Sequence, residues 1–116
     1  MLFIDKNTDT PLRDLKGRKG GFKDTNPEVI LTHVLRAVYE RVGLDPKLIE
    51  DVSVGNVLPP GGGANAARIA ALSAGIPNTS AVNTVNRQCS SGLTSINQIA
   101  NEIRTGQIDI GIGAWL

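Results

Sequence analysis

The residues with the clearest chemical potential surround the single cysteine, in the stretch Asn86-Arg87-Gln88-Cys89-Ser90-Ser91-Gly92-Leu93. An apolar, β-branched run at 81–85 precedes this stretch, and a helical pattern over about 91–105 follows it. A thiol at a turn from a strand into a helix lies near unpaired backbone N–H groups and the positive end of the helix dipole, which favour the thiolate. Because a thiolate attacks carbonyl carbon, the stretch predicts that Cys89 is a nucleophile. The alternative is a buried structural thiol, since free cysteine also packs as a small hydrophobic side chain.

The other candidate residues are less specific than Cys89. The single histidine, His33, lies one position off the apolar stripe of an expected helix, which predicts a surface histidine rather than a catalytic base. One cysteine excludes an internal disulfide, and one histidine excludes a histidine-rich metal site, so no metal is predicted. The segment Pro59-Pro60-Gly61-Gly62-Gly63 lacks the lysine and hydroxyl residue of a phosphate-binding loop, so it predicts a conformational loop.

The composition indicates one globular domain. The chain has 116 residues, of which 41% are hydrophobic, and a net charge of +1 with acids and bases interspersed, so a nucleic-acid partner is not expected. No apolar run approaches the roughly 20 residues of a membrane span, and the first residues lack the features of a signal peptide. Residues 1–24 are basic and rich in glycine, which predicts a surface loop with a short strand at 2–4. A contact of this loop with phosphate or an acidic partner is the alternative.

Apolar periodicity predicts alternating helices and strands after this segment. One helix begins at Asn26-Pro27 and ends at Gly43, and a short turn from Asp45 directs Leu48 and Ile49 inward. Strands are predicted at 51–57 (half-buried), 81–86 and 109–113 (buried), with helices at 65–74 and 91–105. The last helix carries few charges, so it is expected to be buried on most sides and to screen Cys89 from water. Connections too long for hairpins then predict an α/β fold with a largely parallel sheet.

The stretch 86–93 closely resembles the nucleophile signature of the thiolases, which move acyl groups between coenzyme A thiols by making or breaking a carbon–carbon bond. Three other segments resemble successive landmarks of the same family, and the first is most similar to the peroxisomal 3-ketoacyl-CoA thiolases. The agreement runs from about residue 20 to residue 113, whereas ketosynthases have other residues around their nucleophile. The three segments are Gly20-Gly21-Phe22-Lys23-Asp24-Thr25, Val54-Gly55-Asn56-Val57-Leu58 and Gly106-Gln107-Ile108-Asp109-Ile110-Gly111.

The resemblance implies a domain organisation. Residues 1–116 would form an incomplete, truncated thiolase amino-terminal domain, with a loop-rich lead-in at 1–24 and an α/β core at 25–116. The expected architecture is a partial βαβαβ layer with a mostly parallel sheet. Residues 1–12 and Ala114-Trp115-Leu116 depart from the family pattern. A half-sheet without its covering elements would expose apolar surface, so poor solubility or oligomers are expected.

The resemblance also implies roles for the site. Cys89 would attack the carbonyl of a 3-ketoacyl-CoA and hold the acyl group as a thioester, and its backbone N–H would be one donor of an oxyanion hole. The family's histidine base and second cysteine belong to its carboxyl-terminal half, so this chain alone is expected to be inactive. An alternative is a non-catalytic truncated form that acts only by pairing with a full thiolase subunit.

Substrates, partners and compartment follow from the same resemblance. Acyl-CoA and coenzyme A would be substrates in fatty acid β-oxidation, with no bound cofactor. The complete protein would be a homodimer or tetramer, with Arg87 and Gln88 close to the contact between subunits. The peroxisome is the expected compartment, with the mitochondrion and the cytoplasm as alternatives.

Overall fold

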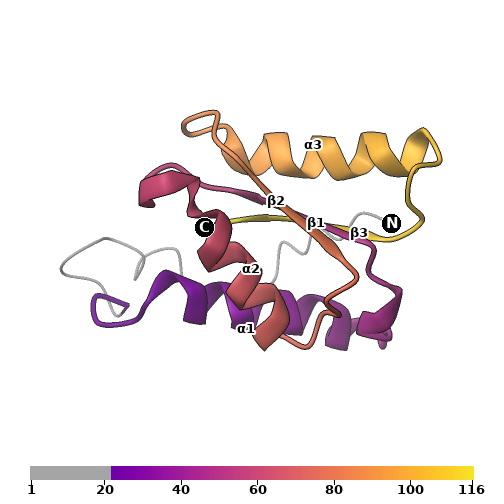
Figure 1. Cartoon of the computed structure of the whole chain (residues 1–116), viewed down its shortest axis with the longest axis horizontal. Coiled ribbons are helices and arrows are strands. Elements are labelled where there is room, and N and C mark those ends of the chain that lie inside the picture. Colours follow the sequence, from indigo (N-terminus) through magenta and orange to yellow (C-terminus); the bar gives the residue numbers. More distant parts are fainter. Residues whose placement is uncertain (1–21) are drawn as a thin grey trace.

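The computed structural model describes residues 22–116. They form three layers, with a parallel sheet between two layers of helices (Figure 1). Strands β1 (Asp51–Gly55), β2 (Ala81–Val85) and β3 (Gly111–Trp115) lie in the order β2-β1-β3 and run parallel. Helices α1 (Pro27–Arg41) and α2 (Ala64–Ser73) cover one face of the sheet, and α3 (Ser91–Arg104) covers the other. The predicted α/β class with a mostly parallel sheet is therefore confirmed.

The local signals in the sequence place the helices well. Pro27 is the first residue of α1 and Asn26 occupies its N-cap, although the Asn26 side chain makes no capping hydrogen bond. Gly75 follows α2 with a φ of 92°, a conformation that residues with a Cβ rarely adopt. Within residues 22–116, no helix is long and apolar enough to cross a membrane. The predicted strand at 2–4 and the basic part of the lead-in lie outside the described residues.

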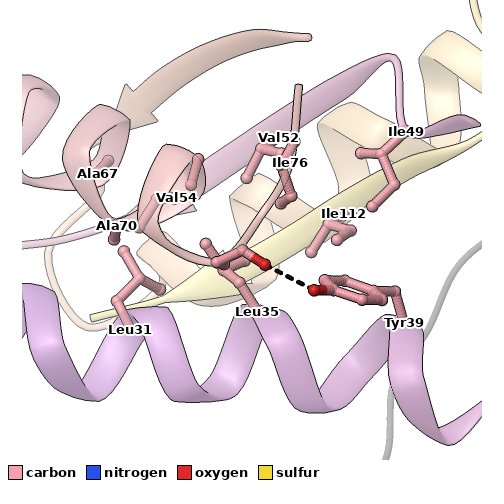
Figure 2. Packing of buried hydrophobic residues seen from close by; sticks show 12 residues of the cluster. Leu31, Leu35, Tyr39, Ile49, Val52, Val54, Ala67, Ala70, Ile76 and Ile112 are labelled. Carbon is pink, nitrogen blue, oxygen red and sulfur yellow. Dashed lines mark hydrogen bonds between the residues drawn. The ribbon is translucent and has the colours of Figure 1, made fainter. Parts of the chain in front are cut away.

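The apolar core lies between the sheet and the α1–α2 layer (Figure 2). Small side chains on α2 allow α1 to approach closely, and the hydroxyl of Tyr39 donates to the carbonyl oxygen of Ala74 at 2.6 Å. The short segment η2 (Pro46–Leu48) leads into β1 and buries Ile49, but Leu48 is 53% exposed, so its predicted inward direction is wrong. The members of this core are Leu31, Leu35, Tyr39, Ile49, Val52, Val54, Ala67, Ala70, Ala71, Ala74, Ile76 and Ile112.

β1 is buried on both faces, which corrects the prediction of a half-buried strand at 51–57. Val52 and Val54 enter the core, while Ser53 points to the other face and donates to Gln98 Oε1 of α3 at 3.3 Å. All three side chains are fully buried because β1 is the central strand and a helix layer lies on each side. The strand also ends at Gly55, two residues before the predicted boundary.

α3 packs closely on the sheet because glycines of β3 leave room for its Ile96 and Ile99. A Cβ atom built on Gly113 of β3 would lie 2.7 Å from the Cα of Ile96, so only glycine permits this approach. Ser91, Ser95 and Ile99 are the buried residues of α3, whereas Leu93 is 72% exposed. The prediction that α3 is buried on most sides is wrong within residues 22–116. In this part of the chain α3 is an outer layer, and the sheet covers one of its faces.

Polar side chains lie between β1 and α3. Gln98 Nε2 donates to Glu102 Oε1 at 3.0 Å, while Asp51 Oδ1 and Glu102 Oε2 are buried and accept no hydrogen bond from described groups. Burial raises the pKa of Asp51 above its ordinary value of 3.8, and the charge of Glu102 raises it further, although a hydrogen bond from the Val52 backbone opposes the shift. The folded chain therefore binds a proton at Asp51 more tightly than the unfolded chain does.

We expect the substitution Asp51→Asn to stabilise the chain more at neutral pH than in acid. A carboxyl whose pKa is raised by folding contributes fully to stability below its unfolded pKa, and that contribution is lost as pH rises through the folded pKa. Asparagine removes this loss. Urea unfolding between about pH 4 and pH 7 measures the difference. Asp24→Asn, at a side chain that is 87% exposed, is the control, and an Asp51→Asn effect that does not change with pH would contradict the prediction.

Candidate active site

The carboxyl ends of the parallel strands meet at one edge of the sheet. β1 ends at Gly55, and the next residue, Asn56, donates its backbone N–H to the carbonyl oxygen of Val85, the last residue of β2, at 3.0 Å. On the other side of β1, the N–H of Leu116 donates to the carbonyl oxygen of Gly55 at 2.8 Å. The turn that carries Cys89 follows β2 directly, so the candidate nucleophile lies at this edge.

The segment 86–90 is a tight turn from β2 into α3. Gln88 has a φ of 52°. Among the described residues, it is the only one besides glycine with a positive φ. The side chain of Asn86 accepts from the N–H of Gln88 at 3.0 Å, and the N–H of Ser90 donates to the carbonyl oxygen of Arg87 at 3.1 Å. A left-handed conformation at Gln88 costs of order 1 kcal/mol, and such residues cluster at functional sites.

Ser91, the first residue of α3, fixes this turn. Its side chain is fully buried, and its Oγ accepts from the N–H of Arg87 at 2.8 Å. The same hydroxyl donates to the carbonyl oxygen of Gln88 at 2.6 Å and lies 3.2 Å from the carbonyl oxygen of Asn56. The side chain of Ser91, which follows Cys89, therefore connects the two residues before Cys89 with the end of β1.

We expect Ser91→Ala to lower the free energy of unfolding by about 2 kcal/mol, because it removes the acceptor of the partly buried Arg87 N–H and the hydroxyl that meets the carbonyl oxygens of Gln88 and Asn56. Urea unfolding measures the change. Ser90→Ala is the matched control, since Ser90 is exposed and its side chain makes no capping hydrogen bond. Equal losses in the two variants would contradict the role assigned to the Ser91 hydroxyl.

Gly55 allows α3 to begin directly against β1. A Cβ atom built on Gly55 would lie 2.4 Å from the carbonyl carbon of Ser91 and 2.7 Å from the nitrogen of Gly92. Real Cβ atoms do not come this close to backbone, so the start of α3 and the end of β1 require glycine here. The position of the Cys89 turn depends on this contact.

Cys89 itself is exposed. The prediction that α3 screens it from water is wrong in this structure, and so is the alternative of a buried structural thiol. The backbone hydrogen bonds that fix the turn in the described part of the chain are donated by Ser90, Ser91 and Thr94, and none of them is donated by the N–H of Cys89. The described turn is therefore held without the N–H of Cys89.

His33 lies on the exposed side of α1, as predicted, and α1 covers the face of the sheet opposite to α3. The structure thus does not bring His33 beside Cys89. Among residues 22–116, no group of three or more histidine, cysteine or acidic side chains could hold a metal ion. Within this part of the chain, Cys89 remains the candidate nucleophile at the carboxyl edge.

The structural role of Asn56 was not predicted from the sequence. This residue is 1% exposed, and its Nδ2 donates to the carbonyl oxygen of Gly62 at 2.6 Å. Gly62 belongs to the short segment η3 (Pro60–Gly63), in which Gly61 and Gly62 have positive φ, so the predicted conformational loop is confirmed. A polar residue directly after a buried apolar strand was the available signal.

Comparison with known proteins agrees with this architecture. Residues 8–114 match the model of the thiolase N-terminal domain. The chain belongs to the thiolase family. The resemblance predicted from the motifs is therefore confirmed, and the match extends beyond the range of about 20–113 over which those motifs agree.

Individual thiolases are similar over most of the chain. The peroxisomal 3-ketoacyl-CoA thiolase of Yarrowia lipolytica is 54% identical over 98 residues, which are 84% of this chain and 24% of that protein. The peroxisomal 3-ketoacyl-CoA thiolase B of Rattus norvegicus is 54% identical over 94 residues, which are 81% of this chain and 22% of that protein. The chain thus spans about a quarter of the length of these relatives.

Solved thiolase structures share the fold. The peroxisomal 3-ketoacyl-CoA thiolase of Saccharomyces cerevisiae, described as a five-layered structure of two core domains of identical topology, superposes with a TM-score of 0.77 at 49% identity. The match covers 83% of the 116-residue chain and 29% of the yeast chain. A structure of the dimeric peroxisomal thiolase of the same organism gives a TM-score of 0.75 at 48% identity, over 82% of this chain and 25% of that one.

Proposed function

We propose that Cys89 is the acyl-accepting nucleophile of a thiolase reaction. Its sulfur forms a bond to C3 of a 3-ketoacyl-CoA, the C2–C3 bond breaks, and the released electron pair leaves as the enolate of acetyl-CoA, which takes up a proton. The acyl group then remains on Cys89 as a thioester. Attack by the thiol of a second coenzyme A releases the shortened acyl-CoA and regenerates the cysteine.

The observation that carries this proposal is an exposed thiol in a fixed turn directly before α3, at the carboxyl edge of a parallel sheet. The N-terminus of α3 offers unpaired N–H groups and the positive end of its dipole to an anion. The N–H of Cys89 is a candidate donor to the oxyanion that forms when sulfur adds to the carbonyl. Both features stabilise negative charge at the reacting atoms.

The relatives support the choice of substrates and compartment. Those compared above are named peroxisomal 3-ketoacyl-CoA thiolases, so we infer 3-ketoacyl-CoA and coenzyme A as substrates in peroxisomal fatty acid β-oxidation. The yeast thiolase is described as dimeric, which supports a homodimer for the complete protein. In this interpretation residues 1–116 are an incomplete amino-terminal domain, with its α/β core at 25–116.

This 116-residue chain is proposed to accept an acyl group without turning over. It contains one cysteine and one histidine, and His33 lies on the far side of the sheet from α3. The sequence holds no second thiol, so water has to protonate the enolate that the first transfer releases, and a histidine on the far side of the sheet cannot activate the thiol of coenzyme A for the second transfer. Incubation with acetoacetyl-CoA and coenzyme A is therefore expected to yield at most one equivalent of acyl transfer per chain, and steady production of acetyl-CoA would overturn this part of the proposal.

Intact-mass analysis after incubation with acetoacetyl-CoA tests the role of Cys89. An acetyl adduct on Cys89 that hydroxylamine removes is the expected result, forming about tenfold faster in the folded chain than in the same chain in urea. Cys89→Ser should show no adduct. Equal rates in the folded and unfolded chains would mean that the fold does not activate the thiol, and the proposal would fail.

A second candidate is a non-catalytic subunit that pairs with a complete thiolase. β2, the strand that leads into the Cys89 turn, supports it, because β2, like β3, is an edge strand of the described sheet and leaves its other edge open. Co-expression with a complete thiolase, followed by a pull-down, tests this role. Recovery of mixed dimers supports it, and recovery of the two proteins separately excludes it.

A further inference from the structure

The hydroxyl of Ser91 makes contacts that the acyl-transfer chemistry above does not use. Ser91 is 0% exposed, and its Oγ accepts from the N–H of Arg87 at 2.8 Å. The same Oγ lies 2.6 Å from the carbonyl oxygen of Gln88 and 3.2 Å from that of Asn56. A hydroxyl has one proton to donate, and the shorter distance assigns it to Gln88. The side chain of Ser91 therefore binds directly to the residue before Cys89.

The carbonyl oxygen of Gln88 accepts two hydrogen bonds from Ser91. One comes from the hydroxyl, and the other comes from the backbone N–H of Ser91 at 3.0 Å. Any residue other than proline could supply the backbone bond, whereas the other bond requires a hydroxyl at position 91. The hydroxyl thus fixes the direction of this carbonyl group beyond what the backbone alone achieves.

This carbonyl group belongs to the peptide unit that also contains the N–H of Cys89. A peptide unit is planar, and the described residues have no cis peptide bond, so its C=O and N–H point in opposite directions. By holding the carbonyl end, Ser91 therefore also fixes the direction of the Cys89 N–H. The backbone hydrogen bonds that hold the described turn do not use this N–H.

The residue before this peptide unit is in a strained conformation. Gln88 has a φ of 52°, and a left-handed conformation of a residue with a Cβ persists only where its surroundings hold it. The side chain of Asn86 binds the N–H of Gln88, and the side chain of Ser91 binds both the carbonyl oxygen of Gln88 and the N–H of Arg87. Ser91 therefore holds the backbone that leads into Cys89 as well as the peptide plane that Cys89 shares.

The direction of the Cys89 N–H matters in a reaction that places negative charge on oxygen. When a thiolate adds to a carbonyl carbon, the carbonyl oxygen becomes an oxyanion, which a preorganised N–H stabilises. Alkylation by iodoacetamide instead displaces iodide from carbon and forms no oxyanion. The two reactions share the sulfur of Cys89, but acylation alone uses the N–H.

We propose that Ser91 is a positioning residue for acyl transfer, whose hydroxyl fixes the Gln88–Cys89 peptide unit and so directs the N–H of Cys89 to the oxyanion. The proposal rests on the proposed function in that Cys89 is the acyl-accepting residue. It requires neither a particular acyl-CoA nor turnover, because every acyl donor that reacts with Cys89 forms an oxyanion of the same kind.

The ratio of two reaction rates of Cys89 in the folded 116-residue chain tests the proposal. With p-nitrophenyl acetate, sulfur bonds to the acetyl carbon and the C–O bond breaks. The electron pair leaves with p-nitrophenolate, and the thiol proton goes to solvent. Ser91→Ala is expected to slow this acylation about tenfold, since complete loss of an oxyanion donor costs about 10²–10³ in rate. Alkylation by iodoacetamide should change less than about twofold, because the thiol itself stays at the start of α3.

Intact mass after acylation, with the signal of Cys89→Ser subtracted, counts the adduct on Cys89 alone. Ser95→Ala is the matched control, since Ser95 is equally buried on α3 but its Oγ donates to the carbonyl oxygens of Gly92 and Ala114, outside the turn. Both of its rates should equal those of the unsubstituted chain. An unchanged ratio of the two rates in Ser91→Ala, or an equal fall of this ratio in Ser95→Ala, would overturn the proposal.

Circular dichroism establishes that each variant is folded. If Ser91→Ala is unfolded in buffer, all rates are measured in sucrose, which favours the compact state. A Ser91→Ala chain that stays unfolded in sucrose would show that the hydroxyl serves the fold, and the proposal would be wrong. Failure of Cys89 to form a thioester with acetoacetyl-CoA would refute the proposed function instead, because the rate ratio requires no coenzyme A.

Discussion

Replacing Gly55 by alanine is expected to lower the free energy of unfolding by about 3 kcal/mol, at the upper end of the cost of overpacking. The new methyl group would meet the carbonyl carbon of Ser91 at 2.4 Å and its oxygen at 2.5 Å. These atoms belong to the backbone at the start of α3, so no side-chain rotation relieves the contact. The helix has to move away from β1, and the Cys89 turn has to move with it.

Urea unfolding measures this loss, and Gly106→Ala is its control. Gly106 ends the α3 segment with a φ of 74°, but nothing lies within 4 Å of a Cβ atom at this position. The control therefore reports the cost of a left-handed alanine alone, about 1 kcal/mol. A loss in Gly55→Ala no larger than in the control would show that α3 does not rest on Gly55.

The sequence predicts the elements of this fold well because their signals are local. A proline at the first position, an apolar stripe and a closing glycine bound α1 within two residues of the structure. The alanines of α2 predict a close neighbour, and α1 is that neighbour. Parallel strands follow from connections that are too long for hairpins. None of these inferences requires knowledge of distant contacts.

Burial was predicted less well, because it depends on the layer in which each element lies. Ser53 alternates with two core valines, which is typical of a half-exposed strand, yet α3 covers it. Leu93 belongs to the apolar side of α3 by periodicity, yet it is 72% exposed, because the side of α3 that the sheet covers carries Ser91, Ser95 and Ile99. The period of a helix gives its faces, but the number of layers decides which of them is covered.

The candidate site divides in the same way. Cys89 could be predicted because the change from strand to helix and the cysteine are adjacent in the sequence. The contributions of Asn56 and Ser91 could not, because 35 positions separate them and their hydrogen bond exists only once β1 and α3 pack. The close approach at Gly55 is of the same kind, since a glycine at the end of a strand can serve a turn as readily as a tight contact.

The second large effect is expected in the core, where Leu35→Ala should lower the free energy of unfolding by about 3 kcal/mol. Leu35 of α1 is 0% exposed and packs in the core between the helices and the sheet (Figure 2). Its truncation therefore leaves a cavity between the α1–α2 layer and the sheet. Leu48→Ala is the matched control, because the short turn from Asp45 predicts an inward direction for Leu48, whereas the structure leaves it 53% exposed. Its loss should stay within about 0.5 kcal/mol. Urea unfolding of both variants compares the two expectations directly, and similar losses would mean that Leu48 is covered in solution.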